Sequence, residues 1–121
     1  MITKDFAVHF ADDWIDVWNA HDLERILAHY TDDFEMTSPV IASRMGVASG
    51  TLKGKEKVGE YWSKGLAAFP GLKFTPRAVT FSLNSVALFY ESSIHGQAIE
   101  WFSFDAAGLV VKAIAHYQEP R

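Results

Sequence analysis

The chain has 121 residues, of which 49% are hydrophobic and 21% charged, and its net charge is -4. This balance excludes a disordered chain and suits one globular domain over residues 1–121, while the absence of cysteine excludes disulfides and zinc–thiolate sites. The basic residues are scattered, and neither a signal peptide nor a membrane span of roughly 20 apolar residues is apparent. We therefore expect a cytoplasmic protein that binds neither nucleic acid nor membrane.

The first half of the chain predicts three amphipathic helices. Over residues 5–20, apolar side chains recur at three- and four-residue intervals with acidic residues on the opposite side. Asp22 is a suitable N-cap for a short second helix that runs to Tyr30. A third helix starts at Gly54 and ends before Pro70.

The segment between the second and third helices is less regular. Residues 34–38 indicate a short strand, and residues 39–50 indicate a loop because they mix Pro, Gly and Ser with apolar side chains in no clear period. The apolar side chains of this loop either pack against the body of the protein or a partner, or form a lid over a pocket. A few residues of strand are expected around Thr51.

The second half of the chain has the character of a sheet. Its β-branched and aromatic runs are 74–83, 86–94, 98–104 and 110–117. Short connections between successive runs imply a four-stranded antiparallel meander, and helices followed by strands define an α+β fold. The last strand is apolar on both faces, and the helices can cover only one. We therefore expect the convex face of the sheet to pack against a second subunit in a homodimer.

Several segments occur in an order that is familiar from one superfamily. They are residues 14–22, residues 30–33, Gly54 at a helix start, residues 104–108, and His116-Tyr117 at the end of an apolar strand. In these features the chain resembles the nuclear transport factor 2-like superfamily, which includes ketosteroid isomerases and SnoaL-like polyketide cyclases. The resemblance implies a cystatin-like, cone-shaped, curved antiparallel sheet packed on three N-terminal helices. It also implies a deep apolar pocket.

The ketosteroid isomerases imply roles for particular positions. Their carboxylate base corresponds here to Ser38, which cannot abstract a proton without a base of its own. Their helix-one tyrosine corresponds to Trp14, and their protonated acid on the penultimate strand corresponds to Glu100. A second tyrosine, on the second helix, is kept as Tyr30. The resemblance thus implies Glu100, Tyr30 and Trp14 as candidate catalytic residues, but not standard ketosteroid isomerisation.

Glu100 is the acid to which the resemblance draws attention. Alternation over residues 98–104 places it on one face with Phe102, where burial would raise its pKa. Alternatively, this face is the convex one and Glu100 pairs with a cation there. A tight turn at His95-Gly96 would set Glu91 directly opposite Glu100, so that the two share a proton. A one-residue slip would place the two carboxylates on different faces.

Aromatic and small side chains complete the expected pocket. Trp14, Tyr30 and Trp62 each carry an N–H or O–H group that would need a hydrogen-bond partner in a core without water, which favours a position at a pocket. Alternatively, aromatic residues at helical spacing are ordinary core residues. Alanines on the last strand would leave space. The residues expected to contact a ligand are Ser38, Trp62, Phe102, Ala113, Ala115 and Tyr117.

The function that these features favour is the binding of a small apolar or aromatic molecule in an internal pocket. The five histidines have no metal-binding spacing and there is no phosphate loop, so neither a metal nor a cofactor is expected. Catalysis at such a site would be cofactor-free proton transfer of the isomerase, cyclase or dehydratase type. The alternative is a non-catalytic ligand-binding or dimerisation and scaffold domain, so the sequence leaves enzyme activity open.

Overall fold

The computed structural model describes residues 1–118, which form four helices and six strands. In chain order these are α1 (Lys4–Asn19), α2 (Leu23–Leu27), β1 (Tyr30–Thr37), α3 (Pro39–Met45), β2 (Thr51–Lys53), α4 (Lys55–Ala68), β3 (Phe74–Phe81), β4 (Ser85–Ser92), β5 (Gly96–Phe104) and β6 (Val110–Tyr117). Within this part of the chain, no helix is both long enough and apolar enough to cross a membrane.

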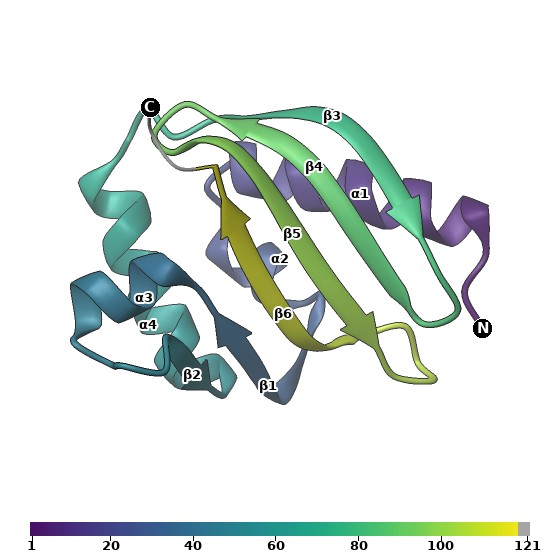
Figure 1. Cartoon of the computed structure of the whole chain (residues 1–121), viewed down its shortest axis with the longest axis horizontal. Helices are drawn as coiled ribbons and strands as arrows, with labels where there is room; N and C mark the ends of the chain where they lie inside the picture. Colours follow the sequence, from purple (N-terminus) through teal and green to yellow (C-terminus); the bar gives the residue numbers. More distant parts are fainter. Residues whose placement is uncertain (119–121) are drawn as a thin grey trace.

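The six strands form one sheet in the order β2-β1-β6-β5-β4-β3 (Figure 1). The antiparallel meander from β3 to β6 is confirmed. The expected four-stranded sheet is wrong in number, because β1 pairs in parallel with β6 and β2 pairs antiparallel with β1. This extension joins segments far apart in the sequence, which a local residue pattern does not report.

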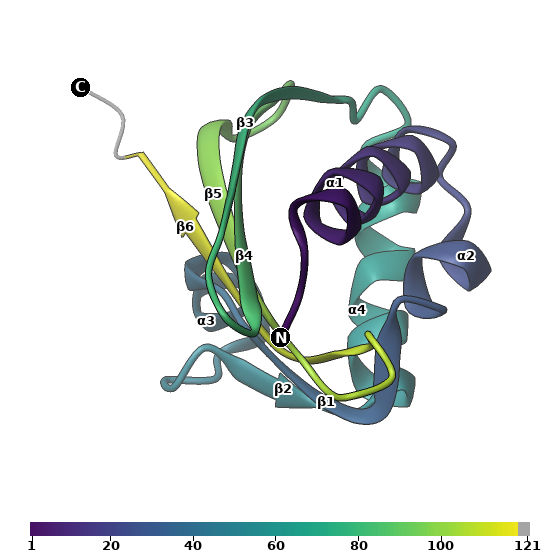
Figure 2. The same ribbon diagram turned by 90° about the vertical axis from the view of Figure 1, so that its right-hand side faces the viewer.

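The helices and the sheet form two layers, as the α+β prediction requires. Figure 2 shows α1, α2 and α4 together on the concave side of the curved, unclosed sheet. Aromatic side chains fill the space between the layers. Phe10 on α1 meets the ring of Phe102, and Trp14 meets the rings of Phe74 and Phe102. Register shifts in β3 and β6 accompany the curvature of the sheet.

The second helix ends earlier than expected. It stops at Leu27, and Tyr30 is the first residue of β1 rather than the last of a helix. The backbone N–H of Val110 donates to the carbonyl of His29 at 2.8 Å, which ties this point of the chain to the start of β6. Tertiary pairing therefore overrides the helical period of the sequence here.

The segment expected as a loop contains a helix, α3. Ser38 caps it by accepting a hydrogen bond from the backbone N–H of Val40 at 3.1 Å, and Pro39 occupies its first position. Gly46 ends it with a φ of 65°, a left-handed conformation that glycine adopts without strain. These start and stop signals are present in the sequence. Ile41 is fully buried, as one of the two interpretations of the segment anticipated.

Candidate functional site

A cavity of about 440 Å³ lies where α3 and α4 face β1 and the ends of β4 and β6. Its floor, defined here as the buried lining residues, consists of Trp18, Met36, Ser38, Trp62, Phe74, Tyr90 and Ser92. Its rim, defined as the exposed lining residues, consists of Arg44, Met45, Lys64, Ala68 and His95. A cavity of this size and aromatic character suits a small organic molecule.

The residues singled out in the sequence fall into two groups around this cavity. Ser38, Trp62 and Tyr117 border it. The others are buried in the adjacent core and do not border it: Trp14, Tyr30, Glu100, Phe102, Ala113 and Ala115. The second group therefore lies behind the lining residues.

Glu100 reaches the cavity only through another side chain. It lies on β5, is 3% exposed, and accepts a hydrogen bond at Oε1 from the hydroxyl of Tyr90 at 3.3 Å. Tyr90 in turn belongs to the cavity floor. Burial raises the pKa of Glu100 to about 8, and the Tyr90 hydrogen bond opposes this rise. At neutral pH the side chain is therefore mostly a neutral carboxylic acid.

Burial and the charge of Glu100 also affect the four tyrosines of the chain. Burial is the main cause that raises the pKa of Tyr30, Tyr61, Tyr90 and Tyr117, and the charge on Glu100 raises each of them further. These hydroxyls consequently act as neutral hydrogen-bond donors and acceptors rather than as phenolates. Three of them border the cavity: Tyr61, Tyr90 and Tyr117.

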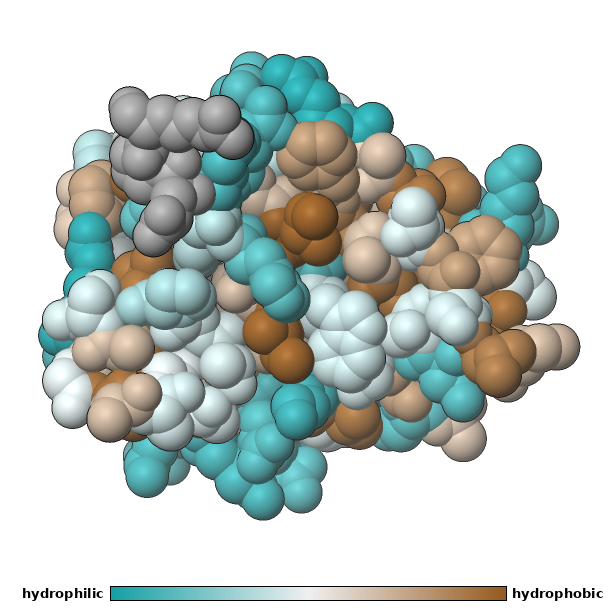
Figure 3. All heavy atoms as spheres, in the orientation of Figure 1, coloured by the Kyte–Doolittle hydropathy of each residue, from teal (hydrophilic) through white to brown (hydrophobic). Residues whose placement is uncertain are grey.

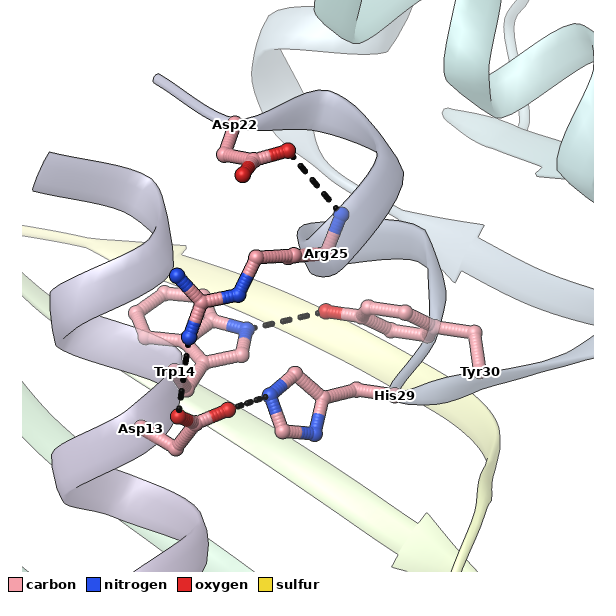
Figure 4. Close-up of polar contacts among 6 residues, drawn as sticks. All are labelled: Asp13, Trp14, Asp22, Arg25, His29 and Tyr30. Carbon is pink, nitrogen blue, oxygen red and sulfur yellow. Dashed lines mark hydrogen bonds and ion pairs between the residues drawn. The ribbon is translucent and has the colours of Figure 1, made fainter. Parts of the chain in front are cut away.

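Trp14 and Tyr30 form a hydrogen bond with each other in the core. The indole Nε1 of Trp14 donates to the hydroxyl of Tyr30 at 3.0 Å (Figure 4). The same view shows a hydrogen bond between Oδ2 of Asp13 and Nε2 of His29 at 2.7 Å, which holds α1 against the start of β1. Because the two polar tips face each other, neither points to the cavity in this arrangement.

The sequence left open whether Glu91 lies opposite Glu100 or on the other face of the sheet, and the structure has the second arrangement. The β4–β5 turn comprises residues 93–95, so Glu91 lies opposite Gln97 and Glu100 lies opposite Leu88. The altered register turns the two carboxylates to different faces. Glu91 instead forms an ion pair with Arg77 at 2.9 Å on the outer face.

Ser38 is the N-cap of α3. Its hydroxyl caps the helix, and a hydrogen bond with Ser38 also lowers the pKa of Tyr117, which burial raises. No carboxylate or histidine makes a hydrogen bond to Ser38 within residues 1–118. The position at which the resemblance led us to look for a base therefore holds a hydroxyl that caps a helix.

Several lining residues were not anticipated from the sequence. Alternation along β4 would have placed Tyr90 on one face with Leu88 and Ser92, so the signal for it was available. Arg44 was missed because α3 was not foreseen. His95 was assigned only to a hairpin turn, and it is the turn geometry that brings it to the rim.

The fold and the cavity together define an α+β protein with a helix-covered, cone-shaped sheet and an aromatic cavity at one end. The SnoaL-like domain matches residues 11–118, and the chain belongs to this family. A solved SnoaL-like protein of unknown function from Burkholderia thailandensis is 47% identical, with 98% of each chain covered and a TM-score of 0.95.

More distant solved structures share the fold alone. A nuclear transport factor 2-like protein of unknown function from Cytophaga hutchinsonii is 14% identical, with 98% of this chain and 92% of that chain covered and a TM-score of 0.71. TerC, co-crystallised with polyporic acid, is 16% identical, with 93% and 92% covered and a TM-score of 0.76. No protein with a curated description matches the chain. The nuclear transport factor 2-like fold expected from the sequence is confirmed.

Proposed function

We propose that the cavity binds a small, largely apolar or aromatic molecule, and that Tyr90 supplies the hydrogen bond that orients it. The observation that carries this proposal is the pairing of Tyr90, on the cavity floor, with the buried acid Glu100 behind it. When Glu100 is neutral, its carboxyl O–H can donate to the Tyr90 oxygen instead of accepting from it, and the Tyr90 proton is then free to donate to a carbonyl or hydroxyl oxygen of a ligand. The co-crystal of TerC with polyporic acid supports small-molecule binding by this fold.

Trp18 provides a second observation in favour of a ligand. It borders the cavity and is 7% exposed, yet residues 1–118 offer its indole N–H no acceptor. Buried N–H groups without an acceptor are uncommon in folded proteins. A ligand oxygen that approached this edge after a small side-chain adjustment would satisfy it.

The chemistry that such a site supports is proton transfer without a cofactor. Tyr90 would donate its proton to a ligand carbonyl oxygen while the adjacent carbon loses a proton to water, Glu100 would return a proton to Tyr90, and water would reprotonate Glu100. Tyr30 and Trp14 would support the surrounding polar core. The second candidate function is non-catalytic ligand binding. It is favoured because Ser38 caps α3 and is not a base, so the site has no base at residue 38 to take a proton from a ligand.

Filling the cavity tests the binding proposal. Gly65 on α4 borders the cavity, and a Cβ added there would meet nothing within 4 Å. We expect Gly65→Phe to abolish thermal stabilisation by any ligand found among steroids, phenols, terpenoids and polyketide-like aromatics. A ligand at 100 times its Kd should stabilise the wild type by about 2.7 kcal/mol. Ala67→Phe, on the exposed side of the same helix, is the matched control and should keep the response.

The outcomes separate the proposals. Equal stabilisation of Gly65→Phe and wild type, or no stabilisation across the panel, would contradict binding in this cavity. For a ligand that binds, incubation in D₂O followed by mass spectrometry tests proton transfer. Deuterium uptake that Tyr90→Phe abolishes would support catalysis, whereas binding without uptake would support the non-catalytic function.

The outer face of the sheet is the proposed contact with a second copy of the chain. Phe89 and Ile99 lie opposite each other there and are 36% and 44% exposed, and Trp101 pairs with Ile114 beside them. Figure 3 shows apolar residues over the central strands of this face. A two-fold dimer would remove this surface from water.

A further inference from the structure

The rim of the cavity carries positive charge that the molecule as a whole does not. Arg44 on α3 and Lys64 on α4 both border the cavity, and within residues 1–118 no Asp or Glu does so. The whole chain, in contrast, has a net charge of -4. A cavity whose lining charges have one sign raises the local concentration of ligands of the opposite sign.

The two cations differ in what they already contact. Nζ of Lys64 lies 3.2 Å from a carboxylate oxygen of Glu60, so its charge is partly neutralised. The side chain of Arg44 takes part in none of the ion pairs formed within residues 1–118. Its guanidinium carbon lies 4.9 Å from the centroid of the Phe69 ring, at the end of α4. This stacking holds the planar group beside the cavity and leaves its in-plane N–H donors unused.

The charge of Arg44 is also felt by other lining residues. Burial raises the pKa of Tyr61, and the guanidinium opposes that rise. Burial lowers the pKa of His95, and the guanidinium lowers it further. Because Tyr61 lies on α4 and His95 in the β4–β5 turn, the field of Arg44 extends to two further elements that line the cavity.

We propose that Arg44 determines the ligand class of this cavity, and that the ligand is an aromatic or apolar molecule carrying one anionic group, a carboxylate or an enolate, at its rim end. The anion would receive two parallel N–H donors from the guanidinium, while the apolar body contacts Trp62 and Phe74 on the floor. This inference rests on the proposed function, because it specifies the ligand of the same cavity.

A purely structural role for Arg44 is the competing explanation. It lies in the last turn of α3, where a cation interacts favourably with the helix dipole. That role would affect the stability of the protein but would not distinguish a carboxylate from a neutral amide of the same shape. The test therefore measures this distinction together with stability.

The experiment compares acids with their amides: 2-naphthoate with 2-naphthamide, and 4-biphenylcarboxylate with its amide. Binding at pH 7.5 is followed by calorimetry and by quenching of tryptophan fluorescence. We expect the wild type to bind each acid roughly five-fold more tightly than its amide, which is modest because Arg44 is exposed. Arg44→Gln should weaken acid binding more than amide binding, so that this preference is lost, and should shift the Tm little. Arg77→Gln, which removes a cation on the outer face, should keep the preference.

Two results would overturn the inference in different ways. Equal affinity of the wild type for acid and amide, or an acid preference that survives in Arg44→Gln, would refute the role of Arg44 while leaving the binding cavity standing. Failure of the wild type to bind any of the four probes would contradict the proposed function itself.

Discussion

The hydroxyl of Tyr90 lies 3.3 Å from Oε1 of Glu100, and within residues 1–118 this is the one hydrogen bond made by that carboxyl. The two side chains come from neighbouring antiparallel strands and point into the space under the helices. Tyr90 also borders the cavity, whereas Glu100 does not. Tyr90 thus lies between the buried acid Glu100 and the proposed ligand, and its hydrogen bond to Glu100 affects both the pKa of that acid and the stability of the protein.

Stability should decrease as the pH rises through the titration range of Glu100. Its pKa is raised from 4.5 to about 8 in the folded protein, so between these values the folded state holds a proton that the unfolded state has lost. The free energy of unfolding should therefore fall by up to roughly 1.4 kcal/mol per pH unit in this window. Glu100→Gln, which stays neutral, should remove this dependence when unfolding in urea is measured at pH 5, 6.5 and 8.

Glu91→Gln is the matched control for that measurement. Glu91 lies on the outer face of the adjacent strand and pairs with Arg77, so its substitution should leave the decrease with pH in place. If wild type and Glu100→Gln lost stability in parallel, the raised pKa of Glu100 would be refuted.

Tyr90→Phe should raise the pKa of Glu100 still further. The Tyr90 hydrogen bond lowers that pKa, and its loss leaves the buried carboxyl without this partner. We expect a stability cost of about 1–3 kcal/mol, the usual result of leaving a buried polar group unpaired. Carbon-13 NMR titration of the Glu100 carboxyl gives the pKa directly. An unchanged or lower value would show that the hydrogen bond has no effect on the acid.

Gly50 and Gly46 provide a matched pair that tests the α3 segment. Both have positive φ, 68° and 65°, so alanine at either position carries backbone strain. At Gly50, an added Cβ would also lie 2.9 Å from the carbonyl oxygen of Ser38, whereas at Gly46 it would meet nothing within 4 Å. We expect Gly46→Ala to cost about 1 kcal/mol and Gly50→Ala clearly more, as measured by chemical denaturation. Equal costs would contradict the close packing of Gly50 against the N-cap of α3.

The proposed dimer predicts a change of oligomeric state when charge is placed on the outer sheet face. Ile99→Lys should convert a dimer into a monomer in sedimentation velocity experiments, because it introduces a cation into an apolar contact. Leu83→Lys is the control, since Leu83 is an exposed apolar residue in the β3–β4 connection rather than in the sheet. A wild type that is already monomeric at high concentration would contradict the proposal.

Local patterns in the sequence were sufficient for much of the fold. The three- and four-residue spacing of apolar residues predicted α1, and alternating β-branched and aromatic runs predicted the meander from β3 to β6. The same alternation placed Glu100 on one face with Phe102, and both are buried. These features follow from neighbouring residues because side-chain direction in a helix or strand has a fixed period.

The remaining features were decided by contacts between distant segments. The parallel pairing of β1 with β6 turned Tyr30 from an expected helical residue into the start of a strand. The length of the β4–β5 turn set a register that separates Glu91 from Glu100. The packing of α3 against β2 and β6 brought Arg44 to the cavity rim, over the ring of Phe69 at the end of α4. Such arrangements depend on the free energy of the whole packed structure, in which pairings between distant segments compete with one another. The sequence by itself therefore determined which elements form and which face of each is apolar, whereas the tertiary structure decided which side chains meet at the cavity.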